Sequence, residues 1–260
     1  MSILEKIIAA KQIEVATRKA QISIANLTSG QLFETKCYSL VQSLQATGSS
    51  GVIAEFKRKS PSKGLFSASA KSSVICPGYQ KAGAAGISIL TDHEFFGGEL
   101  ADIEEARPLV SLPILRKDFV IDEYQIIEAK GIGADVVLLI AAALSVQACQ
   151  RLSLFAKSLG LEVLLEVHNK EELFDFVNDE VDLLGVNNRN LKTFETNIEL
   201  SKELADLIPA KFAKVAESGL NSVQQVKELR DYGYCGFLIG ETFMKESDPA
   251  KQCADFIGAL

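Results

Sequence analysis

The chain has 260 residues, is 47% hydrophobic and 7% aromatic, and carries a formal net charge of −7 at pH 7. This composition is typical of a folded α/β protein and excludes a disordered or fibrous chain, while the acidic charge and the lack of a long Lys/Arg run argue against nucleic acid or an anionic membrane as a partner. The five cysteines are scattered without a CxxC pair, so neither a disulfide framework nor a zinc site is expected, and with no apparent leader or membrane-spanning segment we expect a cytoplasmic protein.

The first predicted element is an amphipathic helix over residues 3–20. Its charged residues are expected on the remaining faces, and its apolar face is made by Leu4, Ile7, Ile8 and Val15. Residues 1–45 together are predicted to form an N-terminal helical extension. Because a closed barrel completes its own sheet, we expect the fold to form without this extension.

From residue 51 onward, short apolar runs alternate with helical stretches. Eight runs have the character of buried strands, at residues 52–56, 86–90, 112–115, 135–140, 162–166, 183–186, 213–216 and 236–239. Among the helical stretches between them are residues 122–130, 145–159, 170–177 and 222–232.

Eight strand–helix units, spaced by roughly 20–35 residues, are the number found in a (β/α)8 barrel. A doubly wound open sheet is the alternative, but it usually has fewer strands and a Gly-rich turn after the first. No GxGxxG or GxxxxGK[ST] motif follows any strand here. We therefore predict an α/β protein consisting of one (β/α)8 barrel domain over residues 1–260.

Charged and amide side chains follow several of the predicted strands. In such a barrel the carboxyl ends of the strands meet at one mouth, where the chemistry takes place. Because strand side chains alternate between two faces, the residues expected at the mouth are Glu55, Lys57, Lys59, Lys117, Phe119, Glu166, Asn187, Arg189, Glu217 and Glu241. A structural ion pair is the alternative for any one of them, but so many charges around one mouth favour an active site.

The loops after the last two strands contain glycine, as Ser218-Gly219 and Gly240-Glu241. Either glycine alone could be an ordinary turn residue. At this pair of barrel loops, however, backbone amides commonly hold a phosphate. The sequence therefore predicts a small phosphate-bearing substrate.

Histidine is scarce, with only His93 and His168 in the chain. We interpret both as loop or cap residues, although alternation from Glu166 could turn His168 inward. Two histidines without an HExxH motif do not make a usual zinc site. Acid–base chemistry is therefore assigned to Lys and Glu side chains, whose pKa values depend on burial and on each other.

Several motifs are specific enough to indicate a family. Besides the N-terminal helix, they are EFKRKSPSKG (55–64), TDHEFFGG (91–98), LRKDF (115–119), EVHN (166–169), GVNNRNLKTF (185–194), AESG (216–219) and LIGETFM (238–244). On these motifs the chain resembles the indole-3-glycerol phosphate synthases of tryptophan biosynthesis along essentially its whole length. One departure is Asn190, where the family usually has Asp, and this puts in doubt only a supporting role beside Arg189.

The resemblance implies a reaction. Its substrate, 1-(2-carboxyphenylamino)-1-deoxyribulose 5-phosphate, closes to an indole with loss of carbon dioxide and water. Lys117 is the expected acid on the ketone oxygen. Lys57, helped by Arg189 and Ser60, is expected to hold the substrate carboxylate.

Dehydration then needs a base and an acid. The resemblance implies Glu166 as the first candidate, with Glu55, Lys57 and Asn187 placed to share the work. It leaves the division of roles among them open.

The remaining implied roles concern binding. Phosphate is expected to be held by Lys59 and by the Ser218-Gly219 and Gly240-Glu241 loops. Glu217 is expected to orient the site, and Phe119 to face the anthranilate ring. No metal or redox cofactor is expected, the N-terminal helix is expected near the barrel mouth, and the chain is expected to be a monomer or a weak homo-oligomer.

Three alternatives stay open at this point. A Schiff-base aldolase would also need inward lysines. A sugar-phosphate isomerase of the same pathway would need no cation for a carboxylate at the first strand. A catalytically silent barrel could bind phosphate-bearing ligands and use its N-terminal helix for a partner.

Overall fold

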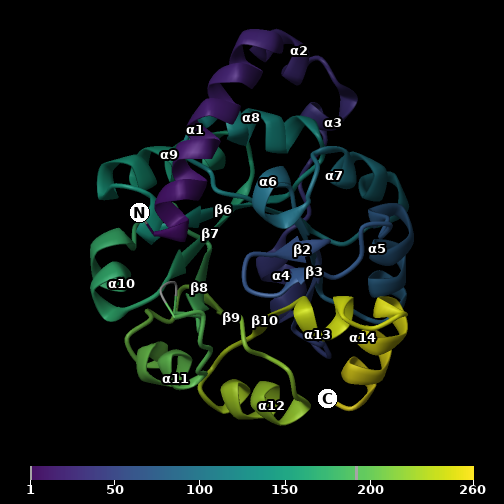
Figure 1. Cartoon of the computed structure of the whole chain (residues 1–260). Coiled ribbons are helices and arrows are strands. Elements are labelled where there is room, and N and C mark those ends of the chain that lie inside the picture. Colours follow the sequence, from purple (N-terminus) through teal and green to yellow (C-terminus); the bar gives the residue numbers. More distant parts are fainter. Residues whose placement is uncertain (1, 191–192) are drawn as a thin grey trace.

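The computed structural model of the chain describes residues 2–190 and 193–260, so Leu191 and Lys192 of the GVNNRNLKTF motif lie outside the described residues. Eight parallel strands form a closed barrel in which β1 pairs with both β10 and β4. The strands are β1 (Val52–Phe56), β4 (Gly86–Leu90), β5 (Ile114–Lys117), β6 (Val136–Ile140), β7 (Glu162–Val167), β8 (Leu183–Asn187), β9 (Ala213–Glu217) and β10 (Gly236–Ile239). The predicted (β/α)8 barrel is confirmed (Figure 1).

Helices surround the barrel (Figure 1). They are α5 (Ser72–Lys81), α6 (His93–Phe96), α7 (Ala101–Ala106), α8 (Glu123–Gly131), α9 (Val146–Ser158), α10 (Lys170–Phe176), α11 (Glu199–Ala205), α12 (Val223–Asp231), α13 (Glu241–Met244) and α14 (Pro249–Gly258), with short 3-10 turns at Arg107–Leu109 and Ala141–Ala143. A small hairpin of β2 (Lys59–Ser60) and β3 (Gly64–Leu65) follows β1.

Three of the predicted helices began one residue too early because their N-cap residue was counted as helical. Asp122, Ser145 and Ser222 have extended backbones, and their side chains accept hydrogen bonds from amides of the first turn. Such side chains satisfy backbone donors that the helix itself leaves unpaired. Asp and Ser are residue types typical of an N-cap, so the sequence contains the information that each helix begins one residue later.

The third strand lies two residues later than predicted. β5 covers Ile114–Lys117 rather than residues 112–115, because Arg116 does not end the strand. Its side chain is 1% exposed, and its guanidinium lies 2.9 Å from Asp118 Oδ2 and 3.2 Å from Glu128 Oε2. Paired in this way, a charged side chain can occupy a buried strand position.

Apolar side chains fill two separate regions, one inside the barrel and one between the barrel and its helices. In β1, Val52, Ala54 and Phe56 pack in the outer region, whereas Ile53 packs in the inner one. This is the predicted alternation, and it directs Glu55 into the barrel.

The N-terminal segment forms α1 (Ile3–Gln21), α2 (Ile24–Thr28), α3 (Gln31–Glu34) and α4 (Leu40–Gln45). Of these, α4 closes the amino-terminal end of the barrel, since Leu40 and Leu44 belong to the same buried cluster as Ile53 and Val215. A Cβ at Gly86 would lie 2.6 Å from Leu40 Cδ1, so a larger residue in this strand would force the Leu40 side chain of α4 to move. The packing of α4 in the barrel interior weighs against the expectation that the fold forms without residues 1–45, which stays a prediction.

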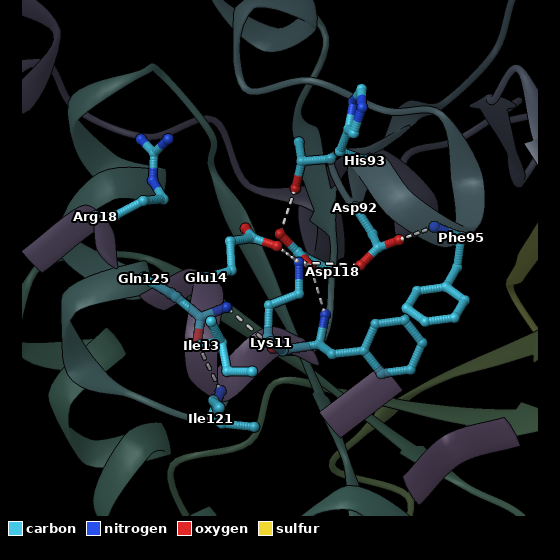
Figure 2. A network of polar contacts seen from close by, with 12 residues as sticks. Lys11, Ile13, Glu14, Arg18, Asp92, His93, Phe95, Asp118, Ile121 and Gln125 are labelled. Carbon is cyan, nitrogen blue, oxygen red and sulfur yellow. Dashed lines mark hydrogen bonds and ion pairs between the residues drawn. The ribbon is translucent and has the colours of Figure 1, made fainter. Parts of the chain in front are cut away.

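By contrast, α1 lies beside the mouth and is held there by a buried cation. Figure 2 shows Lys11 reaching between two strand-end carboxylates: its Nζ is 3.0 Å from Asp92 Oδ2, 3.0 Å from Asp118 Oδ1 and 2.8 Å from Glu14 Oε2. The side chain is 1% exposed and shares a face with Ile7 and Val15, which are also buried. The expectation that the charges of this helix all lie on other faces is wrong for Lys11.

Candidate active site

The carboxyl ends of the strands surround a cavity of about 490 Å³. This volume is in the range of small-molecule sites. Ile3, Leu4 and Ile7 of α1 contribute to the lining, so the expectation that the N-terminal helix lies near the mouth is confirmed. All but one of the predicted site residues also line the cavity: Glu55, Lys57, Ser60, Lys117, Phe119, Glu166, Asn187, Arg189, Glu217, Ser218, Gly219, Gly240 and Glu241.

The exception is Lys59. It belongs to the β2–β3 hairpin, and its ammonium donates a hydrogen bond to the backbone carbonyl of Glu94 rather than pointing into the cavity. Two other lysines, Lys63 and Lys245, line the cavity instead. The position of Lys59 therefore gives no support to its expected phosphate contact.

Lys117 is the cation at the centre of the site. Its Nζ lies 2.8 Å from Glu166 Oε2 and 3.2 Å from Glu217 Oε2, so side chains from β5, β7 and β9 meet at one point. Burial acts to lower the pKa of Lys117, but the charges of Glu166, Glu217 and Glu55 outweigh it and raise that pKa above the ordinary lysine value. Lys117 is thus a protonated donor, aimed into the cavity and held from two sides.

The two carboxyl groups that face Lys117 differ in protonation. Burial alone would raise the pKa of Glu166, but Lys117 and His168 hold it well below its ordinary value. Burial raises the pKa of Glu217 to about 7, with Glu166 acting in the same direction and Lys117 against it. Glu166 is therefore a carboxylate at neutral pH, while Glu217 keeps its proton to a higher pH than an ordinary glutamate.

Asn187 of β8 and two charged residues at the end of β1 are the other polar groups beside Glu166 and Lys117. Asn187 Nδ2 donates to Glu166 Oε1 at 3.0 Å, and Lys57 Nζ lies 2.6 Å from Glu55 Oε1. Gly240 approaches β1 so closely that a Cβ there would lie 2.2 Å from Glu55 Oε1. The glycine after β10 thus leaves room for the Glu55 side chain, a role that the phosphate interpretation of this loop did not include.

The other glycine loop has an unusual backbone. Ser218 and Gly219 both have positive φ, 65° and 74°, and the first of these is uncommon for a residue with a side chain. Nearby, Arg189 Nη2 and Lys63 Nζ each lie 3.7 Å from a carboxylate oxygen of Glu241. This end of the cavity therefore combines a strained turn with two cations, which suits an anion.

One side of the cavity is apolar. Phe119 stands with its ring centroid 6.1 Å from that of Phe96, and Leu138 and Ile140 of β6 line the same cavity. An aromatic ring of a ligand could be buried here with its polar groups directed toward Lys57 and Lys117. The predicted apolar role of Phe119 stays a prediction that this position supports.

The two histidines have different surroundings. His93 is exposed and paired with Glu99 on the outside. His168 follows β7 directly, as expected of a loop residue, but its ring is buried between Glu166 and Glu172. The signal that could have found it was present, since His168 follows Glu166 by two residues.

The departure at Asn190 has a simple structural outcome. Its side-chain Oδ1 accepts a hydrogen bond from the backbone amide of Thr193 at 3.1 Å. An aspartate oxygen could accept the same bond, so the local turn does not depend on the charge.

Within residues 2–190 and 193–260, no three His, Cys, Asp or Glu side chains are grouped as metal ligands would be. In the same residues, no helix is both long and apolar enough to cross a membrane.

The fold and the cavity together define a class: a (β/α)8-barrel enzyme with Lys/Glu acid–base groups at the carboxyl ends of its strands. The family model described as indole-3-glycerol phosphate synthase matches residues 4–256. The chain is 51% identical over 258 residues to the indole-3-glycerol phosphate synthase of Bacteroides thetaiotaomicron, covering 99% of this chain and 98% of that protein. It is 42% identical over 254 residues to that of Burkholderia ambifaria, covering 97% of each.

A solved structure, 3-hexulose-6-phosphate synthase from Salmonella typhimurium, superposes with a TM-score of 0.63 at 15% identity, covering 81% of this chain and 98% of that one. At this identity the likeness shows the fold alone. The family match and the two relatives show more: the chain belongs to the indole-3-glycerol phosphate synthase family. Membership makes it a carboxy-lyase of tryptophan biosynthesis.

Proposed function

We propose that this cavity converts 1-(2-carboxyphenylamino)-1-deoxyribulose 5-phosphate to indole-3-glycerol phosphate, with Lys117 as the general acid of ring closure. The observation that carries the assignment is the position of the Lys117 ammonium, held at 2.8 and 3.2 Å by Glu166 and Glu217 inside the cavity. In ring closure the ring carbon bearing the carboxylate attacks the ketone carbon, and the ketone oxygen takes a proton. A protonated lysine at this point supplies that proton as charge develops.

Decarboxylation follows at the same ring carbon. The bond to the carboxylate breaks, carbon dioxide leaves, and the electron pair returns to the ring. We assign the carboxylate to Lys57, with help from Ser60, which lines the same cavity, and from Arg189, which reaches in from the Glu241 end. Lys57 is anchored by Glu55 at 2.6 Å, so its position is set before substrate binds.

Dehydration completes the indole. The new hydroxyl leaves as water with a proton from an acid, and the neighbouring CH₂ carbon loses a proton to a base. Glu166 suits the base because it is held ionised by its neighbours. Glu55, Lys57 and Asn187 are placed to share this step, with Asn187 fixing one Glu166 oxygen at 3.0 Å.

For the phosphate we propose the end of the cavity formed by Ser218-Gly219 and Gly240-Glu241. The cations there are Arg189, Lys63 and Lys245, and backbone amides add donors. The Glu241 carboxylate would repel a phosphate, so only its backbone is assigned a contact. Lys59 is left out, since its ammonium is bound to the Glu94 carbonyl.

A Schiff-base aldolase is the competing chemistry. That reaction needs a neutral amine as nucleophile. The carboxylates around Lys117 favour its protonated form, which supports an acid and disfavours an imine-forming lysine.

We further propose that the chain acts in the cytoplasm, as a single domain and as a monomer or a weak homo-oligomer. Its five cysteines are all free thiols, which suits a reducing compartment. Sedimentation at micromolar concentration tests the oligomeric state, and a stable large assembly would contradict it.

The test of the chemistry is the variant Lys117→Ala. We expect turnover to fall on the order of 10²- to 10⁴-fold with substrate binding nearly unchanged. Indole fluorescence reports the product directly because the chain has no Trp. Lys157→Ala is a matched control, since Lys157 pairs with Asp182 and is not among the residues that line the cavity. Retention of more than about a third of wild-type turnover by Lys117→Ala would reject the assignment and make Lys57 the leading acid.

A further inference from the structure

His168 is a largely enclosed titratable group that the chemistry above does not use. Its side chain is 10% exposed and stands between two carboxylates: Nε2 lies 3.2 Å from Glu166 Oε1, and Nδ1 lies 3.2 Å from Glu172 Oε2. A neutral imidazole has one N–H and can donate to only one of these groups, whereas the imidazolium can serve both. Nδ1 has a hydrogen-bond contact with Glu172, whereas Nε2 is buried without a hydrogen bond of good geometry and meets Glu166 as a close charge pair. A carboxylate on each side of the ring favours the imidazolium.

The charges around the ring agree with this. Burial acts to lower the pKa of His168, but Glu166 and Glu172 outweigh it and raise the pKa to about 10. These two carboxylates face the ring directly, one at the end of β7 and one from α10. Behind Glu166, Lys117 of β5 pairs with the other oxygen of that carboxylate, and Glu217 of β9 pairs with Lys117.

Glu172, on the far side of the ring, is itself fixed. Its Oε2 accepts the backbone amide of His168 at 2.8 Å, and its Oε1 accepts Asn169 Nδ2 at 3.1 Å. Its own backbone amide donates to the N-cap oxygen of Asn169 at 2.7 Å. The carboxylate thus lies in the first turn of α10, where the helix favours a negative charge.

On its near side the ring contacts Glu166 from behind. His168 is not among the residues that line the cavity, whereas Glu166 is, and the other Glu166 oxygen faces Lys117. The order in space is therefore α10, Glu172, His168, Glu166 and Lys117.

We propose that His168 is a positioning residue: an imidazolium, held by Glu172, that orients the Glu166 carboxylate toward Lys117 and keeps it charged. The inference rests on the proposed role of Glu166 as the base. It assigns His168 no contact with substrate. The proposal also explains how the Glu166 carboxylate, which is 3% exposed, stays ionised. It has two cations beside it, Lys117 and His168, and a second cation favours the charged form further.

The first test is the state of the ring. The chain has two histidines, so nitrogen-15 NMR of wild type and of His93→Gln assigns both signals. We expect the His168 signals to be those of a doubly protonated ring at pH 8. A ring that titrates near pH 6.5, as an unperturbed histidine does, would overturn the proposal.

The second test is the pH dependence of turnover in His168→Gln. We expect kcat to fall about 10-fold, a part of the roughly 10²–10⁴ that a positioned acid–base group supplies, with KM changed less than about twofold. Without the cation, the pKa of Glu166 rises toward its ordinary value, so the acidic limb of the kcat profile moves to higher pH. A purely structural role would lower the melting temperature and leave that profile unmoved.

Glu172→Gln provides a second variant in which the histidine is kept. Losing one carboxylate lowers the pKa of His168, so kcat should begin to fall at a lower alkaline pH than in wild type. In the double variant the effects on kcat should not add, because Glu172 acts through His168. His93→Gln, the same substitution at an exposed histidine, should leave kcat and its profile unchanged.

The outcomes separate this inference from the proposed function. Glu166→Gln with full turnover would remove Glu166 as the base and with it the basis of the inference. An inactive Glu166→Gln, together with a His168→Gln profile that overlays that of wild type, would reject the role of His168 alone.

Discussion

Replacing Lys11 with Met tests whether one buried cation fastens α1 to the barrel mouth. Met keeps the length and most of the apolar stem but removes the ammonium that lies 3.0 Å from both Asp92 and Asp118. Removing one partner of a buried ion pair typically costs about 3–5 kcal/mol, because the remaining charges lose their compensation. Asp118 keeps Arg116 at 2.9 Å and Thr91 at 2.6 Å, so we expect the lower end, about 3 kcal/mol of unfolding free energy.

The same helix offers a matched control in Lys19→Met. Lys19 lies 2.7 Å from Asp122 Oδ2, but the two side chains are 44% and 34% exposed, and pairs of this kind contribute about 0–1 kcal/mol. Both variants thus remove a Lys–Asp pair from the same helix, and they differ in how far that pair is buried.

Both variants are measured by urea unfolding and by indole fluorescence turnover. Because Ile3, Leu4 and Ile7 line the cavity, a loosened α1 should raise KM and lower kcat together in Lys11→Met and leave Lys19→Met unchanged. If Lys11→Met loses no more stability than Lys19→Met, the buried network does not hold α1, and the apolar face of the helix alone does so.

Two further predictions concern Glu217 and the N-terminal segment. The pKa of Glu217 is raised from 4.5 to about 7, so its contribution to stability is present below pH 4.5 and is lost as the pH rises through 7. Glu217→Gln, which resembles the protonated acid, should therefore have a flatter urea midpoint between pH 5 and pH 8, and parallel curves would contradict this. For the N-terminal segment, deletion of residues 2–22 should leave a barrel that still unfolds cooperatively, with poor turnover and with helical circular dichroism reduced only by the loss of α1. Deletion of residues 2–45 also removes Leu40 and Leu44 from the interior and should abolish cooperative unfolding. A stable barrel after the longer deletion would show that α4 is dispensable.

The barrel and most of its site could be predicted because both depend on local sequence. A strand alternates its side chains strictly, so Glu55 and Lys57 had to face the same way once residues 52–56 were identified as a strand. The shared carboxyl edge of a parallel barrel then brought Lys117, Glu166 and Glu217 together. Lys59 departed from this pattern because alternation holds only within a strand, and the β2–β3 hairpin directs its side chain to Glu94.

The function of α4 was not predictable for a different reason. Leu40 and Leu44 form too short a pattern to show which surface they cover, and what they cover is the open end of a barrel formed by residues that follow later. The residues that indicate the position of α4 lie in the strands, where Gly86 and Gly236 leave room for Leu40 and Leu44. Those glycines are informative only once the barrel has been built.

The position of Lys11 was wrongly expected and the burial of the His168 ring was not foreseen, and both have one shared physical ground. Helical periodicity places Lys11 on the apolar face, and alternation allows His168 to turn inward, but a buried charge is tolerated only with partners. The partners of Lys11 are Asp92 and Asp118, which come from strand ends far along the chain. Asp118 directly follows Lys117, so the end of β5 supplies the proposed general acid to the cavity and, in the next residue, a carboxylate that pairs with Lys11 of α1. Lys117 and the aspartate that fastens α1 are thus consecutive in the chain. A substitution at Lys11 that loosens α1 is therefore expected to disturb Lys117 before any other residue of the site.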